Sequence, residues 1–225
     1  MKSPNNAFNT EQPKPGIPGD LTLEMARSFT EKRISKKRFE HVCGVAEVGE
    51  LLAKRANVDS FLVALACWLH DCCKEIKDKE LVSLAREGGL KPTAIEEENG
   101  HLLHGPVAAL TIEGELGITN KEVLQSVSEH TLGNVPMSDI SKVVFLADCL
   151  EKSRPTAFTA PIWEALESPM ADKKKAVVNL NKAMLKASDL SLVHLLESGR
   201  VIHPKTVDVR NYFLGIVRAV EKAKV

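Results

Sequence analysis

Apolar residues along most of this 225-residue chain recur at steps of three and four positions, the spacing of one face of an α-helix. The clearest stripe, between positions 42 and 56, consists of Val42, Val45, Ala46, Gly49, Leu52, Ala53 and Ala56. No segment combines the strict two-residue alternation of a strand with an Asn-Gly or Asp-Gly hairpin turn. The pattern therefore predicts an all-α fold.

Capping residues, glycines and prolines divide this pattern into separate helices. The predicted helices cover residues 21–34, 36–56, 61–75, 79–87, 105–117, 121–131, 140–151, 172–198 and a last segment behind Pro204. Ser35 is predicted to cap the second helix, and Asp59 or Ser60 the third. Thr119 with Glu122 three residues later resembles a capping box for the sixth helix.

The first nineteen residues differ from the rest because they contain four prolines and no apolar core. We expect a flexible tail over residues 1–19 and one folded domain over 20–225. The tail lacks the features of a secretory signal, and the longest wholly apolar run, Phe61 to Leu69, has about half of the ~18 residues that span a bilayer. We therefore expect a cytoplasmic protein without membrane contact. Residues 153–161 are predicted to form a loop.

Charge and cysteine content exclude several classes of protein. Lys plus Arg and Asp plus Glu both number 30, so no overall field attracts nucleic acid or an anionic membrane, and any attraction for an anionic ligand must be local. Five cysteines in a chain without an export signal indicate reduced thiols that pack as small apolar groups. Cys72 and Cys73 would diverge by roughly 100° on a helix, which argues against their joint use on one metal.

Histidines and aspartates near the ends of several predicted helices form a candidate metal-binding set. Its members are His41, His70, Asp71, His104, His130 and Asp148. Asp148 lies within the apolar segment VVFLADC, where a buried carboxylate requires a cation or strong donors. Imidazole with carboxylate ligands suits iron, manganese, cobalt or zinc rather than magnesium or calcium. From the residues alone, unrelated capping and core polar groups explain this set equally well.

Six segments, in order, make the chain similar to a known family. They are RFEHVCGVAEVGELLAKRA, WLHDCCKE, LLHGPVAA, EHTLG, MSDISKVVFLADCLEKSRP and GRVIHPKTVDVRN. The His-Asp doublet at 70–71 resembles that of the HD-domain phosphohydrolase superfamily. The six segments together resemble its bacterial YqeK-type members, the symmetrical diadenosine tetraphosphate hydrolases, over about residues 35 to 214.

The resemblance implies roles for individual residues. His41, His70, Asp71 and Asp148 match the ligands of a metal that is iron in the family. His104 and His130 match histidines that complete a second cation site in two-metal relatives or contact phosphate, so one ion or two is left open. Two basic residues, Lys74 and Arg154, match residues that contact the nucleotide phosphates. The weaker candidates for nucleotide contact are Thr131, Arg200 and His203. The resemblance also implies catalytic roles for four residues, Asp71, Lys74, His104 and His130. The same four match nucleotide-contacting positions.

The implied reaction is symmetrical cleavage of diadenosine tetraphosphate to two ADP by a metal-bound hydroxide. The partner would be a small dinucleoside polyphosphate, and a homodimer is compatible with the same features. The chain departs from the family pattern at Leu132 and at Lys152 and Ser153. These departures affect the expected substrate preference more than the expected reaction. The alternatives are another HD-type nucleotidase or phosphodiesterase, or a nucleotide-binding regulator or assembly factor without turnover.

Overall fold

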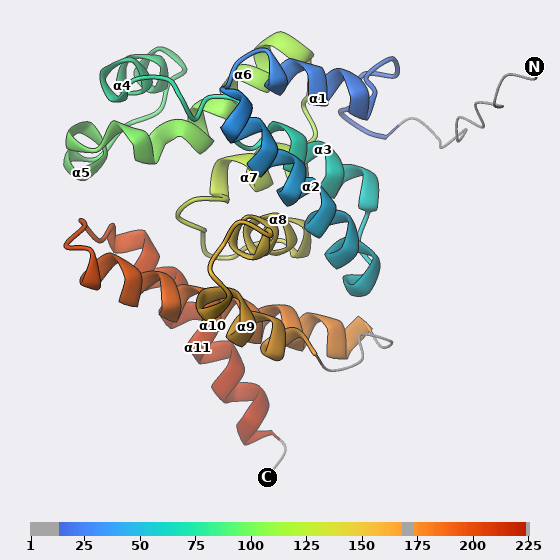
Figure 1. The fold of residues 1–225 in the computed structure, drawn as a ribbon, viewed down its shortest axis with the longest axis vertical. Helices are drawn as coiled ribbons and strands as arrows, with labels where there is room; N and C mark the ends of the chain where they lie inside the picture. Colours follow the sequence, from blue (N-terminus) through green and yellow to red (C-terminus); the bar gives the residue numbers. More distant parts are fainter. Residues whose placement is uncertain (1–13, 168–172, 224–225) are drawn as a thin grey trace, which may run out of the picture.

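The computed structural model describes residues 14–167 and 173–223, and within these ranges the chain is helical, with no strand (Figure 1). The α-helices are α1 (Leu23–Glu31), α2 (Lys36–Ala56), α3 (Ser60–Leu69), α4 (Asp78–Glu87), α5 (Ala94–Glu98), α6 (His104–Leu116), α7 (Lys121–Glu129), α8 (Asp139–Leu150), α9 (Thr156–Leu166), α10 (Lys173–Glu197) and α11 (Pro204–Lys222). A single 3-10 turn, η1 (Gly100–Leu103), precedes α6. The predicted all-α class is confirmed.

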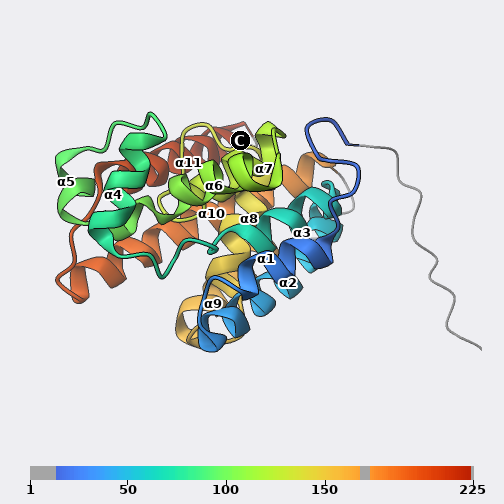
Figure 2. The ribbon, with the colours of Figure 1, turned by 90° about the horizontal axis from the view of Figure 1, so that it is seen from above.

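Helix α8 lies at the centre of the fold (Figures 1 and 2). It packs against α2, α3 and α7 on one side and against α9 and α10 on the other. Nine of its twelve residues are buried, which explains why its sequence is apolar nearly all round. Asp148, close to the C-terminal end of α8, is half-buried.

The third helix is shorter than predicted. α3 packs against α1, α2, α7 and α8, so its continuous apolar run is buried, but it ends at Leu69 rather than at residue 75. Residues 70–75 form turns, in which Cys72 N–H bonds to the Leu69 carbonyl and Lys74 N–H to the Asp71 carbonyl. The predicted divergence of Cys72 and Cys73 is therefore wrong, because their Sγ atoms lie 3.9 Å apart. All five cysteines carry free thiols.

Two predicted helix caps are confirmed, and a third is wrong. Ser35 and Asp59 accept hydrogen bonds from the first backbone N–H groups of α2 and α3. The capping box predicted at Thr119 is not formed, because Asn120 caps α7 and accepts from the Val123 N–H. Asn120 lies one residue closer to the apolar stripe and is an equally good N-cap residue.

The predicted loop over residues 153–161 is also wrong, because α9 begins at Thr156 and contains Pro161. The proline removes one backbone donor from a helix interior, which the sequence alone disfavours. Packing against α8 and α10 outweighs that preference: Ile162 and Leu166 of α9 are buried.

Helices α9, α10 and α11 form a second layer below α8, visible in orange and red in Figure 1. α10 contacts α9 and α11 as well as α8 and the edge of α2. Helices α4 and α5 and the turn η1 lie together at one end of the molecule (Figure 2). Among the described helices, none is both long and apolar enough to cross a bilayer.

The segment that leads into α1 is fastened to the folded body. The Gly16 carbonyl accepts from the N–H groups of Thr119 and Asn120, and the Asn120 side chain donates to the Pro15 carbonyl. The Lys14 ammonium pairs with Asp59. The predicted tail therefore makes fixed contacts from Lys14 onward, while its first thirteen residues lie outside the described range.

We predict that Asp59 contributes to stability through its cap and its ion pair. Its side chain accepts from the N–H groups of Phe61 and Leu62. Asp59→Ala should lower the free energy of unfolding by about 1 kcal/mol, measured by urea denaturation at pH 7. Asp59→Asn, which keeps one acceptor oxygen, should cost less. An unchanged Asp59→Ala variant would contradict the role of this cap.

The pH dependence gives a second check on Asp59. Burial alone would raise the pKa of Asp59, but hydrogen bonds from Lys14 and Leu62 outweigh burial and lower it. A carboxylate with a lowered folded-state pKa stabilises the protein above its unfolded pKa and ceases to do so as the pH falls through the folded value. The advantage of the unmodified chain over Asp59→Asn should therefore be full at pH 7 and shrink below about pH 4.

Candidate metal centre and adjoining cavity

Three buried histidines use the same local contact to fix their rings. The Nδ1 atom of His70 lies 2.7 Å from the Cys67 carbonyl, that of His130 lies 2.7 Å from the Val127 carbonyl, and His104 Nδ1 contacts the His101 carbonyl at 2.5 Å. A carbonyl can only accept, so Nδ1 carries the proton in each ring. The contact spans three residues each time, at the end of α3, α7 and η1. Each neutral ring therefore presents an unprotonated Nε2.

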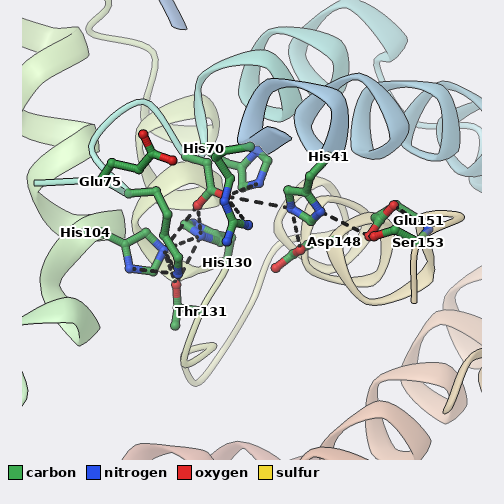
Figure 3. A network of polar contacts seen from close by, with 12 residues as sticks. His41, His70, Glu75, His104, His130, Thr131, Asp148, Glu151 and Ser153 are labelled. Carbon is green, nitrogen blue, oxygen red and sulfur yellow. Dashed lines mark hydrogen bonds and ion pairs between the residues drawn. The ribbon is translucent and has the colours of Figure 1, made fainter. Parts of the chain in front are cut away.

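All of these Nε2 atoms converge on the carboxylate of Asp71. Figure 3 shows the three histidines side by side in this cluster. Asp71 Oδ2 lies 3.5 Å from His70 Nε2, and Asp71 Oδ1 lies 3.3 Å from His104 Nε2 and 3.5 Å from His130 Nε2. The Asp71 side chain is only 3% exposed. Its two oxygens thus face two different groups of imidazole nitrogens.

His41 and Asp148 complete the side of the site that contains His70. His41 Nε2 lies 3.7 Å from Asp71 Oδ2 and 3.1 Å from Asp148 Oδ1. α2 and α8 are packed together, which brings these two residues into contact across 107 positions of sequence. The four residues predicted as metal ligands are therefore brought together.

A close helix contact positions the second imidazole group. A Cβ atom at Gly105, the second residue of α6, would lie 3.0 Å from two α7 carbonyls and 3.2 Å from the His130 ring. The absence of a side chain at Gly105 lets His104 Nε2 approach His130 Nε2 to 3.0 Å. Thr131 Oγ1 lies 3.0 Å from His104 Nε2 and 3.1 Å from His130 Nε2, and Lys74 Nζ lies 3.1 Å from His104 Nε2.

The electrostatics of the site favour neutral rings in the interior. Burial lowers the pKa of His70 and of His104 to about 4 each. Burial also lowers the pKa of the Lys74 ammonium. For His41, burial would lower the pKa, but the carboxylates of Asp148, Asp71 and Glu151 raise it above its ordinary value. A proton or another cation is thus attracted to His41 Nε2.

The donor set fits a transition-metal cation. The Nε2 atoms of His41 and His70 are buried and have no hydrogen-bond partner among the described residues. A buried acceptor without a donor is costly, and a cation would satisfy both lone pairs and the Asp71 charge together. Ligand atoms of His41, His70 and Asp71 lie within 4.8 Å of one another, and those of Asp71, His104 and His130 do so as well. Nitrogen with carboxylate oxygen suits iron, manganese, cobalt or zinc.

A cavity of about 870 Å³ opens beside this centre. Its wall includes Lys74, His130, Thr131, Asp148 and Arg154, together with residues from α10 and α11. This volume falls in the range of sites for small molecules and cofactors. The metal-type ligands therefore lie at the wall of a space large enough for a nucleotide.

Arg154 makes contacts that its sequence context did not indicate. Its Nη2 donates to Asp148 Oδ1 at 2.6 Å, and its Nε donates to the Asp148 carbonyl at 3.0 Å. The guanidinium is thus held at the cavity wall by a residue of the metal centre. A phosphate that binds Arg154 would do so next to Asp148.

The weaker candidates lie farther along the same cavity. Arg200 is exposed and lines the cavity after the end of α10. His203 is buried and caps α11, where its Nδ1 accepts from the Lys205 N–H. His203 Nε2 lies 3.6 Å from Glu96 Oε1. Neither residue reaches the metal-type ligands through a described contact.

Sequence reasoning missed Arg38 and Glu75. Arg38 was not among the predicted site residues, but its Nη1 donates to Asp71 Oδ2 at 3.2 Å. Arg38 lies three residues before His41 on α2, so the two residues share one helix face. This spacing was the signal in the sequence that could have identified Arg38. Glu75 accepts from the backbone N–H of Ser35 at 2.7 Å and ties the turn after α3 to the start of α2.

Comparisons with known proteins agree with this arrangement. Proteins named symmetrical bis(5'-nucleosyl)-tetraphosphatase from Staphylococcus aureus, Halalkalibacterium halodurans and Bacillus subtilis are 28%, 30% and 27% identical to this chain. The matches cover 86%, 84% and 86% of this chain and 95%, 95% and 98% of the relatives.

A solved structure from Clostridium acetobutylicum, described as a predicted HD superfamily hydrolase involved in NAD metabolism, matches with a TM-score of 0.77 and 25% identity. The match covers 87% of this chain and 98% of that one. The family model described as HD domain matches residues 38–153 of the sequence. This range contains all six histidines and aspartates of the centre. This chain therefore belongs to the HD-domain family.

Proposed function

We propose that this chain is a hydrolase that cleaves diadenosine tetraphosphate symmetrically into two ADP, with a divalent metal held by His41, His70, Asp71 and Asp148. The observation that carries the proposal is the group of buried, unpaired imidazole nitrogens around Asp71 at the wall of a nucleotide-sized cavity. Three relatives named for this reaction match 84 to 86% of the chain, which supports the choice of substrate. Iron is the proposed metal, and manganese, cobalt and zinc share the same ligand chemistry.

A metal in this site would supply Lewis-acid activation of water and neutralise charge on a phosphoryl group. Lys74 and Arg154 would bind phosphate oxygens from the cavity wall, where both side chains lie. Thr131, Arg200 and His203 would contact the remainder of the nucleotide along the same cavity.

A route for a proton to the leaving oxygen runs through Lys74, His104 and His130. Lys74 Nζ lies 3.1 Å from His104 Nε2, so the ammonium donates to a neutral ring. His104 Nε2 is 3.0 Å from His130 Nε2. This pair would either pass a proton to the departing phosphate or hold a second cation together with Asp71.

The products of the reaction test the proposal. The unmodified protein, supplied with iron, manganese or cobalt, should convert diadenosine tetraphosphate to ADP alone, as measured by chromatography. ATP with AMP would indicate asymmetric cleavage, and inorganic phosphate a nucleotidase. A panel of other nucleotides, including nicotinamide dinucleotides, addresses the NAD metabolism named for the Clostridium relative. Metal and nucleotide binding without any turnover would favour the regulator alternative.

Metal binding by the unmodified chain can be measured by equilibrium dialysis with Mn²⁺, Fe²⁺ or Co²⁺. His70→Ala and Asp148→Ala should each lose the ion held by the four proposed ligands and all turnover, because each removes one of those ligands. Their helix content by circular dichroism should stay unchanged. Asp189→Ala is the control, since Asp189 lies on α10, pairs with Arg210 and is not among the described residues that line the cavity. Full activity in either ligand variant would contradict the assignment.

The number of ions follows from the same dialysis. A second bound equivalent that His130→Ala removes and His70→Ala retains would assign His104 and His130 to a cation. A single equivalent would assign these two histidines to phosphate contact or proton transfer.

Lys74→Ala should lower kcat/KM by about 10- to 100-fold, because one charge-assisted hydrogen bond to phosphate contributes about 1.5–3 kcal/mol. Lys54→Ala is the matched control, since its side chain is 66% exposed and pairs with Glu50 on the surface of α2. Equal kinetics for both variants would exclude a phosphate contact by Lys74.

A further inference from the structure

A buried carboxylate outside the proposed ligand set contacts the far side of the His41 ring. Glu151 follows α8 directly, and its side chain is only 1% exposed. Glu151 Oε1 lies 3.1 Å from His41 Nδ1, whereas His41 Nε2 faces Asp71 and Asp148. The ring of His41 is therefore held between two carboxylates that lie three residues apart in sequence (Figure 3).

Glu151 itself is held in a fixed position. The backbone N–H of Ser153 donates to Glu151 Oε2 at 2.8 Å, and the Ser153 hydroxyl donates to Oε1. Arg154 Nε lies 3.6 Å from the same Oε1. Two donors and a nearby cation keep the carboxylate ionised, which leaves it able only to accept from His41.

This contact decides which nitrogen of His41 is available. An ionised carboxylate at Nδ1 requires the proton there, so the lone pair of a neutral ring is on Nε2. His70, His104 and His130 reach the same state through backbone carbonyls. A carboxylate accepts more strongly than a carbonyl and also raises the basicity of the ring it contacts.

We propose that Glu151 is a positioning residue for the metal centre, which fixes the Nδ1–H tautomer and the ring orientation of His41 so that Nε2 can bind the cation. The inference rests on the proposed metal site. Glu151 does not act as a ligand itself, because it contacts the nitrogen of His41 that points away from Asp71 and Asp148.

Gly44 provides the space that Glu151 occupies. A Cβ atom at Gly44 would lie 3.1 Å from Glu151 Oε2 and 3.4 Å from Glu151 Cβ, so an alanine there must displace the carboxylate slightly. Gly44 lies in the interior of α2, where alanine is otherwise the more favourable residue for a helix. Gly44→Ala therefore disturbs Glu151 without removing any polar group.

The test is the affinity of the purified full-length chain for Co²⁺ alone, measured by competition with a chromophoric chelator. Glu151→Gln, which keeps the shape and removes the charge, should raise the dissociation constant about 10- to 100-fold. Gly44→Ala should raise it by a smaller factor. Ser153→Ala, which removes one of two donors to Glu151 but leaves the carboxylate facing His41, should change it least. Glu47→Gln removes an exposed carboxylate of α2, the helix that contains His41, and should leave the dissociation constant unchanged.

A spectroscopic readout separates positioning from a structural role. In the Zn²⁺-loaded chain, nitrogen-15 NMR should place the His41 proton on Nδ1, and Glu151→Gln should shift that proton upfield as its acceptor loses charge. Thermal unfolding of each variant checks the fold. Should Glu151→Gln fail to fold, Gly44→Ala decides the matter.

Two results would overturn the inference. One is a folded Glu151→Gln variant with the Co²⁺ affinity of Ser153→Ala and an unshifted His41 proton. The other is a Gly44→Ala variant with unchanged affinity. Failure of the unmodified chain to bind Co²⁺ or any other tested metal would instead overturn the proposed metal site, before any variant is made.

Discussion

The centre of this protein depends on the buried carboxylate of Asp71. Its side chain is 3% exposed and is surrounded by the Nε2 atoms of four histidines, with Arg38 as a donor to Oδ2. Neutral imidazoles present lone pairs rather than protons to this charge, so the assembly is stable only with a cation or with added protons. The buried charge and the converging lone pairs therefore favour the binding of a metal cation.

The helices supply this arrangement through their ends. His70, His104 and His130 each lie where a helix ends or begins, and each Nδ1 contacts the carbonyl three residues earlier in the chain. His41 lies inside α2, and Glu151 provides the acceptor instead. The close packing of α6 on α7 at Gly105 then sets the distance between the His104 and His130 rings.

The sequence was sufficient for the helical class, because hydrophobic periodicity is a local property. The residues that converge on the centre were predicted through the family resemblance, because their ligand chemistry alone left unrelated capping and core groups equally possible. It was not sufficient where tertiary packing overrides local preference. α9 forms despite Pro161, because α8 and α10 cover its apolar face. α3 ends at Leu69, and the turns at 70–75 place Asp71 among the histidines and Lys74 at the cavity wall. Arg38 and Glu151 were missed because their partners lie 33 and 110 residues away.

The central claim is that one cation is bound between His41, His70, Asp71 and Asp148. Anomalous diffraction from crystals loaded with cobalt and ADP tests it most directly. The account predicts an anomalous peak in contact with the Nε2 atoms of His41 and His70 and with Asp71 Oδ2, beside a diphosphate in the cavity. A peak elsewhere, or a His41 ring that binds the metal through Nδ1, would contradict it.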